Sequence, residues 1–140
     1  MKKQIIFFFT LLFASHLGNS QVQDSFSDGN FTSSPIWSGS SSQFIVNGVQ
    51  ELQLNDVLAG QAFLSTPNGA APLSNCEWRI KVRQSFAGSD NNHSRIYLIH
   101  SNGDLSFINA TSGTQGSGYF LKLGEAGSTD AIKLFRDDGA

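Results

Sequence analysis

The carboxylate side chains of this sequence do not form the pair that glycoside hydrolysis requires. A glycosidase places two carboxyl groups around the bond that it cleaves, and on one β-strand such groups must stand at alternate positions to share a face. Glu51, Glu77 and Glu125 each lack a second carboxylate two residues away. We therefore interpret the three glutamates as solvated surface charges.

Nucleophilic and zinc-dependent chemistry have no better support. No Gly-x-Ser-x-Gly elbow occurs outside the Ser/Gly-rich stretches, and neither His93 nor His100 has an evident partner in the sequence. A zinc site would need clustered His and Cys ligands, whereas Cys76 and the two histidines are scattered. The sequence predicts a protein that is not an enzyme.

Calcium binding is an open alternative. Hard oxygen ligands on loops suit this ion, and the candidates are Asp24, Asp28, Asp90, Asn91 and Asn92. The same residue types are common in turns, because their side chains hydrogen-bond to the nearby backbone. We predict no cofactor, with a structural calcium ion as the alternative.

One strand-like segment offers a charged face that could bind a ligand. Glu77, Arg79, Lys81 and Arg83 alternate with apolar residues, and a second such segment carries Arg95 and Tyr97. Aromatic rings stack on sugar rings, and polar groups bind hydroxyls. The candidate ligand-binding residues are Arg79, Lys81, Arg95 and Tyr97. A solvated outer face of a sheet would show the same pattern.

Alternating apolar and polar residues, separated by turn residues, dominate the chain and predict an all-β domain. The expected strands are Phe44–Val46, Val49–Leu54, Ala62–Ser65, Cys76–Phe86, Ser94–His100, Gly118–Leu123 and Ala131–Arg136. Their spacing is typical of an antiparallel β-sandwich.

Two details of this pattern are specific. The dipeptide Asn47-Gly48 predicts a two-residue type I′ turn between two strands. The segment Cys76–Phe86 is the clearest strand, with Cys76, Trp78, Ile80 and Val82 on a buried face. We expect Cys76 to be a small core residue, and Trp37 and Trp78 to be core anchors.

The amino terminus has the pattern of a secretory signal peptide. Lys2 and Lys3 precede a nearly unbroken apolar run from Ile5 to Ala14, too short to cross about 30 Å of hydrocarbon as a helix. Small residues at the −3 and −1 positions indicate cleavage before Gln21, and no cysteine lies there to suggest a lipoprotein. We expect residues 1–20 to be removed and the product to be secreted or displayed on the cell surface, with no membrane span.

Length and charge limit the remaining possibilities. The 140 residues, with a net charge of −2, fit one domain, expected at residues 21–140. A pI near 5.8 gives no basic footprint for nucleic acid. The stretch 137–140 has the composition of a hairpin turn with no strand after it, so we expect the domain to lack its last strands.

Taken in order, six segments resemble the amino-terminal sandwich domain of large secreted proteins of Bacteroidetes. They are Asp24–Phe31, Pro35–Gly39, Phe63–Pro67, Glu77–Val82, Arg95–Leu98 and Gly118–Ile132. Proteins of that family often carry lamin-tail or other immunoglobulin-like domains downstream, and a carboxy-terminal signal for type IX secretion or gliding motility. The resemblance implies a concanavalin-A-like jelly roll of two stacked antiparallel sheets, and surface attachment for a full-length relative.

These observations favour an exported, non-catalytic β-sandwich module that binds a glycan or another extracellular surface ligand. Two alternatives stay open. One is the non-catalytic part of a secreted polysaccharide hydrolase whose active site lies beyond the chain end. The other is a structural spacer without a ligand.

Overall fold

The computed structural model describes residues 22–69, 76–105, 116–127 and 131–139. Within these ranges the regular structure consists of antiparallel strands and one short 3₁₀ helix, η1 (Ser41–Gln43). The predicted all-β, antiparallel class is therefore confirmed, while the jelly-roll sandwich stays a prediction. None of the described residues forms a helix long and apolar enough to cross a membrane. The predicted signal peptide, residues 1–20, lies outside the described residues.

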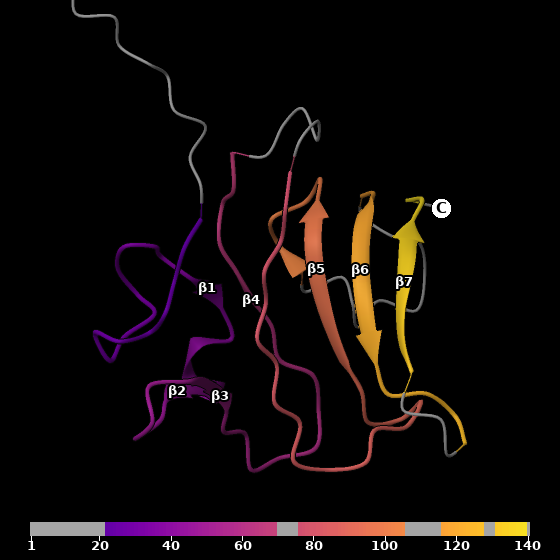
Figure 1. Cartoon of the computed structure of the whole chain (residues 1–140), viewed down its shortest axis with the longest axis horizontal. Helices are drawn as coiled ribbons and strands as arrows, with labels where there is room; N and C mark the ends of the chain where they lie inside the picture. The colour runs from indigo at the N-terminus through magenta and orange to yellow at the C-terminus, as the bar shows by residue number, and fades with distance from the viewer. Residues whose placement is uncertain (1–21, 70–75, 106–115, 128–130, 140) are drawn as a thin grey trace, which may run out of the picture.

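The main sheet has three strands in the order β5-β6-β7 (Figure 1). They are β5 (Ser94–His100), β6 (Gly118–Leu123) and β7 (Ile132–Asp137), and each neighbouring pair is antiparallel. The bounds of β5 and β6 agree with the sequence prediction, and β7 is shifted by one residue. Their β-branched and aromatic residues favour extended structure locally. Within the described residues, β7 is an edge strand.

The register of the main sheet aligns aromatic residues on one face. Tyr97 of β5 lies opposite Phe120 of β6, and Phe120 lies opposite Phe135 of β7. Residues directly opposite each other in an antiparallel sheet point to the same side. One face of the sheet therefore carries a row of three aromatic side chains, which we call the aromatic row.

The pairing of β5 with β6 is interrupted by a bulge. The register shifts between Tyr97 and Ile99, so Leu98 has no opposite residue on β6. The extra residue restores His100 to a position opposite Gly118. As a result His100 follows the aromatic row on the same face of the sheet.

Two small sheets lie on the other side of the molecule (Figure 1). Strand β2 (Phe44–Val46) pairs with β3 (Leu52–Leu54), and β1 (Ser38–Gly39) pairs with β4 (Leu64–Ser65). The hairpin β2-β3 was predicted, although β3 is shorter than expected. Strand β4 contains only the last two residues of the predicted strand Ala62–Ser65, and β1 was not predicted.

The predicted type I′ turn at Asn47-Gly48 is wrong. The loop runs from Asn47 to Glu51, and the positive backbone angle falls on Gln50, with φ of 61°. The side-chain oxygen of Asn47 accepts hydrogen bonds from the N–H groups of Val49 and Glu51, both at 3.0 Å. Asn47 therefore stabilises a wider loop than the two-residue turn that its pairing with glycine suggested.

The predicted strand Cys76–Phe86 is not formed. The segment runs antiparallel to β5 and next to it (Figure 1), yet none of its residues takes part in a backbone–backbone hydrogen bond within the described part of the chain. We call residues 76–86 the unpaired segment. A ladder needs the N–H and C=O groups of both partners in register, and alternation in one sequence does not specify the partner.

The predicted burial along the unpaired segment is also wrong. Trp78, Ile80 and Val82 are 39%, 47% and 45% exposed, and Cys76 is half-buried. Among the described residues only two large hydrophobic side chains, Phe31 and Leu105, are buried. Alternating apolar residues become a core only where a second layer covers them, and the described part of the chain covers these side chains only in part.

The other predicted anchor, Trp37, is half-buried rather than fully enclosed. Its indole Nε1 donates a hydrogen bond of 2.8 Å to Asp24, and its ring lies 6.2 Å from that of Phe26. The backbone N–H of Trp37 donates to the carbonyl oxygen of Phe31. Trp37 therefore fixes the extended amino-terminal part of the domain by polar and aromatic contacts together.

Candidate functional site

The aromatic row is a continuous set of ring contacts across the main sheet. The ring centroids of Tyr97 and Phe120 are 4.9 Å apart, and those of Phe120 and Phe135 are 5.2 Å apart with nearly parallel planes. These separations are in the range of favourable aromatic pairs. Tyr97 and Phe120 are half-buried, whereas Phe135 is 37% exposed. Solvent therefore reaches the row best at Phe135, on the edge strand.

Arg95 and Tyr97, two of the predicted ligand-binding residues, both belong to this arrangement. The guanidinium of Arg95 lies 5.4 Å from the centroid of the Phe120 ring, within the range of a cation–π contact. Arg95 is exposed, so its N–H donors face water as well as the ring. This places hydrogen-bond donors beside an aromatic surface.

His100 extends the row at its other end. Its ring packs edge-on against Tyr97 with centroids 5.5 Å apart, and its side chain is only 3% exposed. The backbone N–H of Asn102 donates to Nδ1 of His100 at 3.1 Å, and Nε2 lies 3.7 Å from the Asp137 carboxylate. His100 therefore links the end of β5 to the end of β7.

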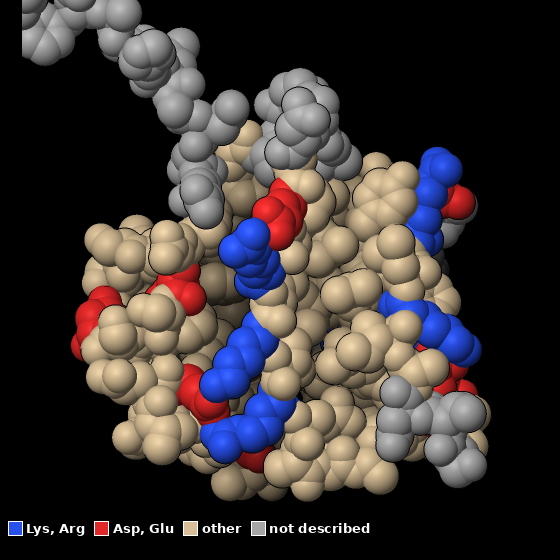
Figure 2. Space-filling model, in the orientation of Figure 1, with Lys and Arg blue, Asp and Glu red and all other residues tan. Residues whose placement is uncertain are grey.

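Arg79 and Lys81, the other two predicted residues, lie on the unpaired segment with Arg83. Figure 2 shows basic side chains in a row over this part of the molecule, with acidic side chains beside them. Arg79 forms an ion pair of 2.7 Å with Glu77, two residues away on the same segment. No contact joins Arg79 or Lys81 to the aromatic row among the described residues, so the four predicted residues form two separate groups.

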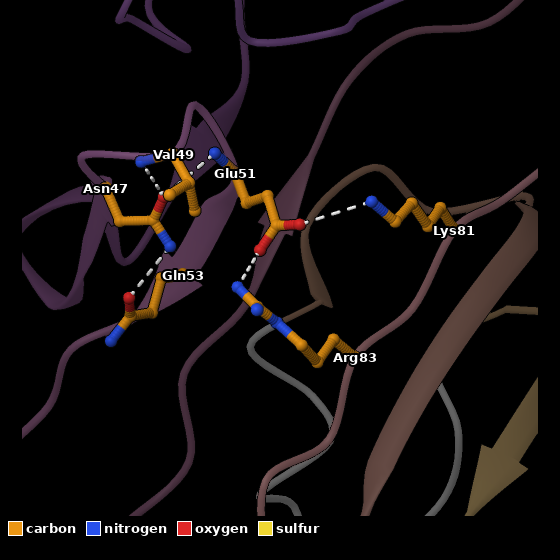
Figure 3. A network of polar contacts seen from close by, with 6 residues as sticks. All are labelled: Asn47, Val49, Glu51, Gln53, Lys81 and Arg83. Carbon is orange, nitrogen blue, oxygen red and sulfur yellow. Dashed lines mark hydrogen bonds and ion pairs between the residues drawn. The ribbon is translucent and has the colours of Figure 1, made fainter.

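Glu51 holds the other two cations of the unpaired segment. Its carboxylate accepts Lys81 at 3.4 Å and also binds Arg83 (Figure 3). The side chain of Glu51 is 30% exposed, whereas that of Lys81 is 86% exposed. These contacts connect the unpaired segment to the β2-β3 hairpin. Both cations are therefore already paired with a carboxylate of the same chain.

A second charged cluster lies at the other end of the main sheet. Lys122 contacts Asp90 at 2.9 Å and Glu125 at 3.7 Å, and Glu125 also contacts Lys133 at 3.0 Å. The hydrogen bond from Lys122 lowers the pKa of Asp90, and the same bond raises the pKa of Lys122. The hydrogen bond from Lys133 lowers the pKa of Glu125. Asp90, Lys122 and Glu125 are therefore held in their charged forms.

A depression opens at the end of the main sheet where β5 ends and β6 begins. It has a volume of about 640 Å³. The depression is lined by Asn68, Ile99, His100, Ser101, Ser117, Gly118, Tyr119, Arg136 and Asp137. None of these residues was predicted as a site residue, because the depression draws on four segments that only the fold brings together.

The candidate calcium ligands Asp24, Asp28 and Asp90 each contact different partners. Asp24 accepts hydrogen bonds from the backbone of Phe26 and the indole of Trp37. Asp28 accepts from Asn30, and Asp90 pairs with Lys122. Among the described residues no group of three or more His, Cys, Asp or Glu side chains could hold a metal ion.

Phe120 and Phe135 are the members of the aromatic row that sequence reasoning missed. Both stand in segments that were expected to be strands, so their extended structure was predictable. Their alignment with Tyr97 depends on the register of β5 with β6 and of β6 with β7.

No protein-family model, no curated protein and no solved structure matches this chain.

Proposed function

We propose that this chain is an exported, non-catalytic β-domain that binds an extracellular glycan at the aromatic row. The observation that carries the proposal is the contact of Tyr97, Phe120 and Phe135 across three strands, with the Arg95 guanidinium over Phe120. Sugar rings present C–H groups that pack on aromatic surfaces, and their hydroxyls accept hydrogen bonds from a guanidinium.

The solvent-accessible end of the row gives the ligand a place to pack. Among the described residues β7 is an edge strand, and the ring of Phe135 on this strand stacks on that of Phe120. Its exposed surface costs free energy in water, and an apolar face of a sugar would cover that surface. The half-buried Tyr97 and Phe120 hold the Phe135 ring in position.

The pairing of the glutamates supports a non-catalytic role. Glu51, Glu77 and Glu125 each contact a lysine or arginine rather than another carboxylate. A general acid in glycoside hydrolysis requires a carboxyl group whose pKa is raised, whereas the pKa of Glu125 is lowered by Lys133. The three side chains serve as partners for cations in this arrangement.

The glycan-binding proposal is tested with the purified product of the full coding sequence on an array of bacterial, plant and host glycans. We expect Phe135→Ala and Arg95→Gln to reduce the signal on the bound glycans by about tenfold, the equivalent of about 1.4 kcal/mol. Leu134→Ala is the matched control, because Leu134 is the neighbouring exposed residue of β7 on the opposite face. An equal loss in all three variants, or binding to no glycan, would contradict the proposal.

Export is tested separately. When the full sequence is expressed in a Gram-negative host, we expect the protein outside the cytoplasm, with Gln21 as its first residue. Fractionation followed by amino-terminal sequencing gives the answer. A product that keeps Met1 and stays in the cytoplasm would contradict export and leave the glycan-binding test unaffected.

A further inference from the structure

We infer that the depression at the end of the main sheet is a second ligand site, which takes one neutral sugar residue with adjacent hydroxyl groups. This inference rests on the proposed glycan-binding function but concerns different residues. The depression has a volume of about 640 Å³, within the range of about 300–1,000 Å³ that is typical of small-molecule sites.

The charges around the depression favour a neutral ligand. Arg136 and Asp137 stand next to each other on β7 and both line the depression. Arg136 also pairs with Asp138 at 2.6 Å, and its side chain is 69% exposed. Because Arg136 is already paired with Asp138 and the carboxylate of Asp137 adds a second negative charge, an anionic ligand gains no net attraction there, and a neutral ligand is favoured over an anion.

The carboxylate of Asp137 is an oriented acceptor. Its side chain is 10% exposed, it lies 3.7 Å from Nε2 of His100, and it accepts a hydrogen bond of 3.3 Å from the N–H of Gly139. Because the N–H of Asn102 donates to Nδ1 of His100, the imidazole ring cannot rotate freely. A held carboxylate loses little side-chain entropy when it binds a hydroxyl group.

Donors complement this acceptor. Ser101 accepts a hydrogen bond of 2.9 Å from the N–H of Ser117, and a hydroxyl group that accepts one hydrogen bond can still donate its own hydrogen to a ligand. The guanidinium of Arg136 provides further donors on the wall. A ligand that meets donors and acceptors side by side must itself offer both, and adjacent hydroxyl groups do so.

The apolar part of the wall suits the C–H face of a sugar ring. Tyr119 is 39% exposed, and Ile99 lies directly opposite it in the sheet. Both line the depression together with the polar groups. Aromatic and aliphatic surface beside a few oriented polar groups is the usual composition of a site for a small ligand.

The test is saturation-transfer NMR and titration with methyl pyranosides of glucose, galactose and mannose, and with methyl glucuronide as the charged probe. We expect at least one neutral glycoside to bind, and the glucuronide to bind more weakly. Tyr119→Ala and Arg136→Gln should each raise the Kd by about tenfold or more. Arg136→Gln tests the site even if Tyr119→Ala is poorly folded, since Arg136 is exposed.

Ile132→Ala is the matched control, because Ile132 is an exposed residue of the same strand that does not line the depression, whereas Phe135→Ala reports on the aromatic row. Glycoside binding that survives Phe135→Ala and is lost with Arg136→Gln supports the inference. Loss with Phe135→Ala alone would overturn this site and leave the aromatic row as the glycan site. Binding of none of the neutral glycosides, or preference for glucuronide, would overturn the inference, while the array experiment still decides the proposed function.

Discussion

The indole Nε1 of Trp78 donates a hydrogen bond to the carbonyl oxygen of Leu98, 3.0 Å away. Leu98 is the bulged residue of β5, and its carbonyl also accepts the side-chain amide of Asn68 at 3.4 Å. In a regular sheet, the backbone of a neighbouring strand would donate a hydrogen bond to such a carbonyl. Here a side chain of the unpaired segment donates it instead.

Trp78→Phe should weaken the attachment of the unpaired segment to β5. The substitution keeps an aromatic ring and removes the N–H donor, so we expect the free energy of unfolding to fall by about 0.5–1.5 kcal/mol. Urea unfolding followed by circular dichroism measures the change. Ile80→Val on the same segment is the control, with an expected change within about 0.5 kcal/mol, because Ile80 is 47% exposed. A Trp78→Phe protein as stable as the wild type would contradict the structural role of this bond.

The strands of the main sheet were predictable because their signal is local. Ser94–His100 and Gly118–Leu123 contain β-branched and aromatic residues between turn residues, and both form strands with the expected bounds. The pairing of Tyr97 with Phe120 was not predictable, since it depends on the register and on a bulge. The candidate site was therefore predicted only through Arg95 and Tyr97.

The unpaired segment shows the opposite case. Its alternation is stronger than that of β5, yet it makes no ladder. Its cations are instead held by Glu77 and by Glu51 of the neighbouring hairpin. The alternation of apolar and polar residues indicates which side chains lie on the same side of an extended segment. The formation of a hydrogen-bonded ladder depends on the position of a partner strand, and the burial of the apolar side chains depends on a layer that covers them.

The Lys122 cluster predicts a specific dependence of stability on pH. The folded-state pKa values of Asp90 and Glu125 lie below their ordinary values of 3.8 and 4.5, so the pairing stabilises the fold above those values. The contribution is lost as the pH falls through the folded-state values. The pKa of Lys122 lies above its ordinary 10.5, so its contribution is present below 10.5 and is lost as the pH rises further.

We therefore expect the stability difference between the wild type and Lys122→Met to be constant between about pH 6 and pH 9. The difference should shrink below about pH 4 and above about pH 10.5. Urea midpoints measured across this range test it, with Lys81→Met as the control, because Lys81 is 86% exposed. A difference that stays constant down to pH 2 would show that Lys122 stabilises the fold through packing alone.

Gly118 is required by the close approach of β5 and β6. A Cβ atom at this position would collide with the carbonyl oxygen of Ile99 and lie 2.9 Å from Cα of His100, and both obstacles are backbone atoms. Gly118→Ala should therefore lower the free energy of unfolding by about 1–3 kcal/mol. Gly48→Ala is the matched control, since no atom lies within 4 Å of a Cβ built there. Similar effects of the two substitutions on thermal unfolding would argue against this packing.

Asn47 should stabilise the β2-β3 hairpin through its side chain rather than through a type I′ backbone. Its Oδ1 accepts the N–H groups of Val49 and Glu51, and its Nδ2 donates to Gln53 at 3.1 Å (Figure 3). Asn47→Ala leaves two backbone donors without this acceptor and should cost about 1–2 kcal/mol, as loss of a capping side chain does.

Asn47→Asp separates the two explanations of the hairpin. The carboxylate keeps the acceptor for both N–H groups, so we expect most of the stability lost with Asn47→Ala to return. A turn that depended on a positive φ at residue 47 would instead be restored by Asn47→Gly, because glycine adopts that backbone region freely but supplies no side-chain acceptor. Denaturation midpoints of Asn47→Asp and Asn47→Gly, measured beside Gly48→Ala, decide between a side-chain and a backbone role for Asn47, and an Asn47→Gly protein as stable as the wild type would favour the backbone.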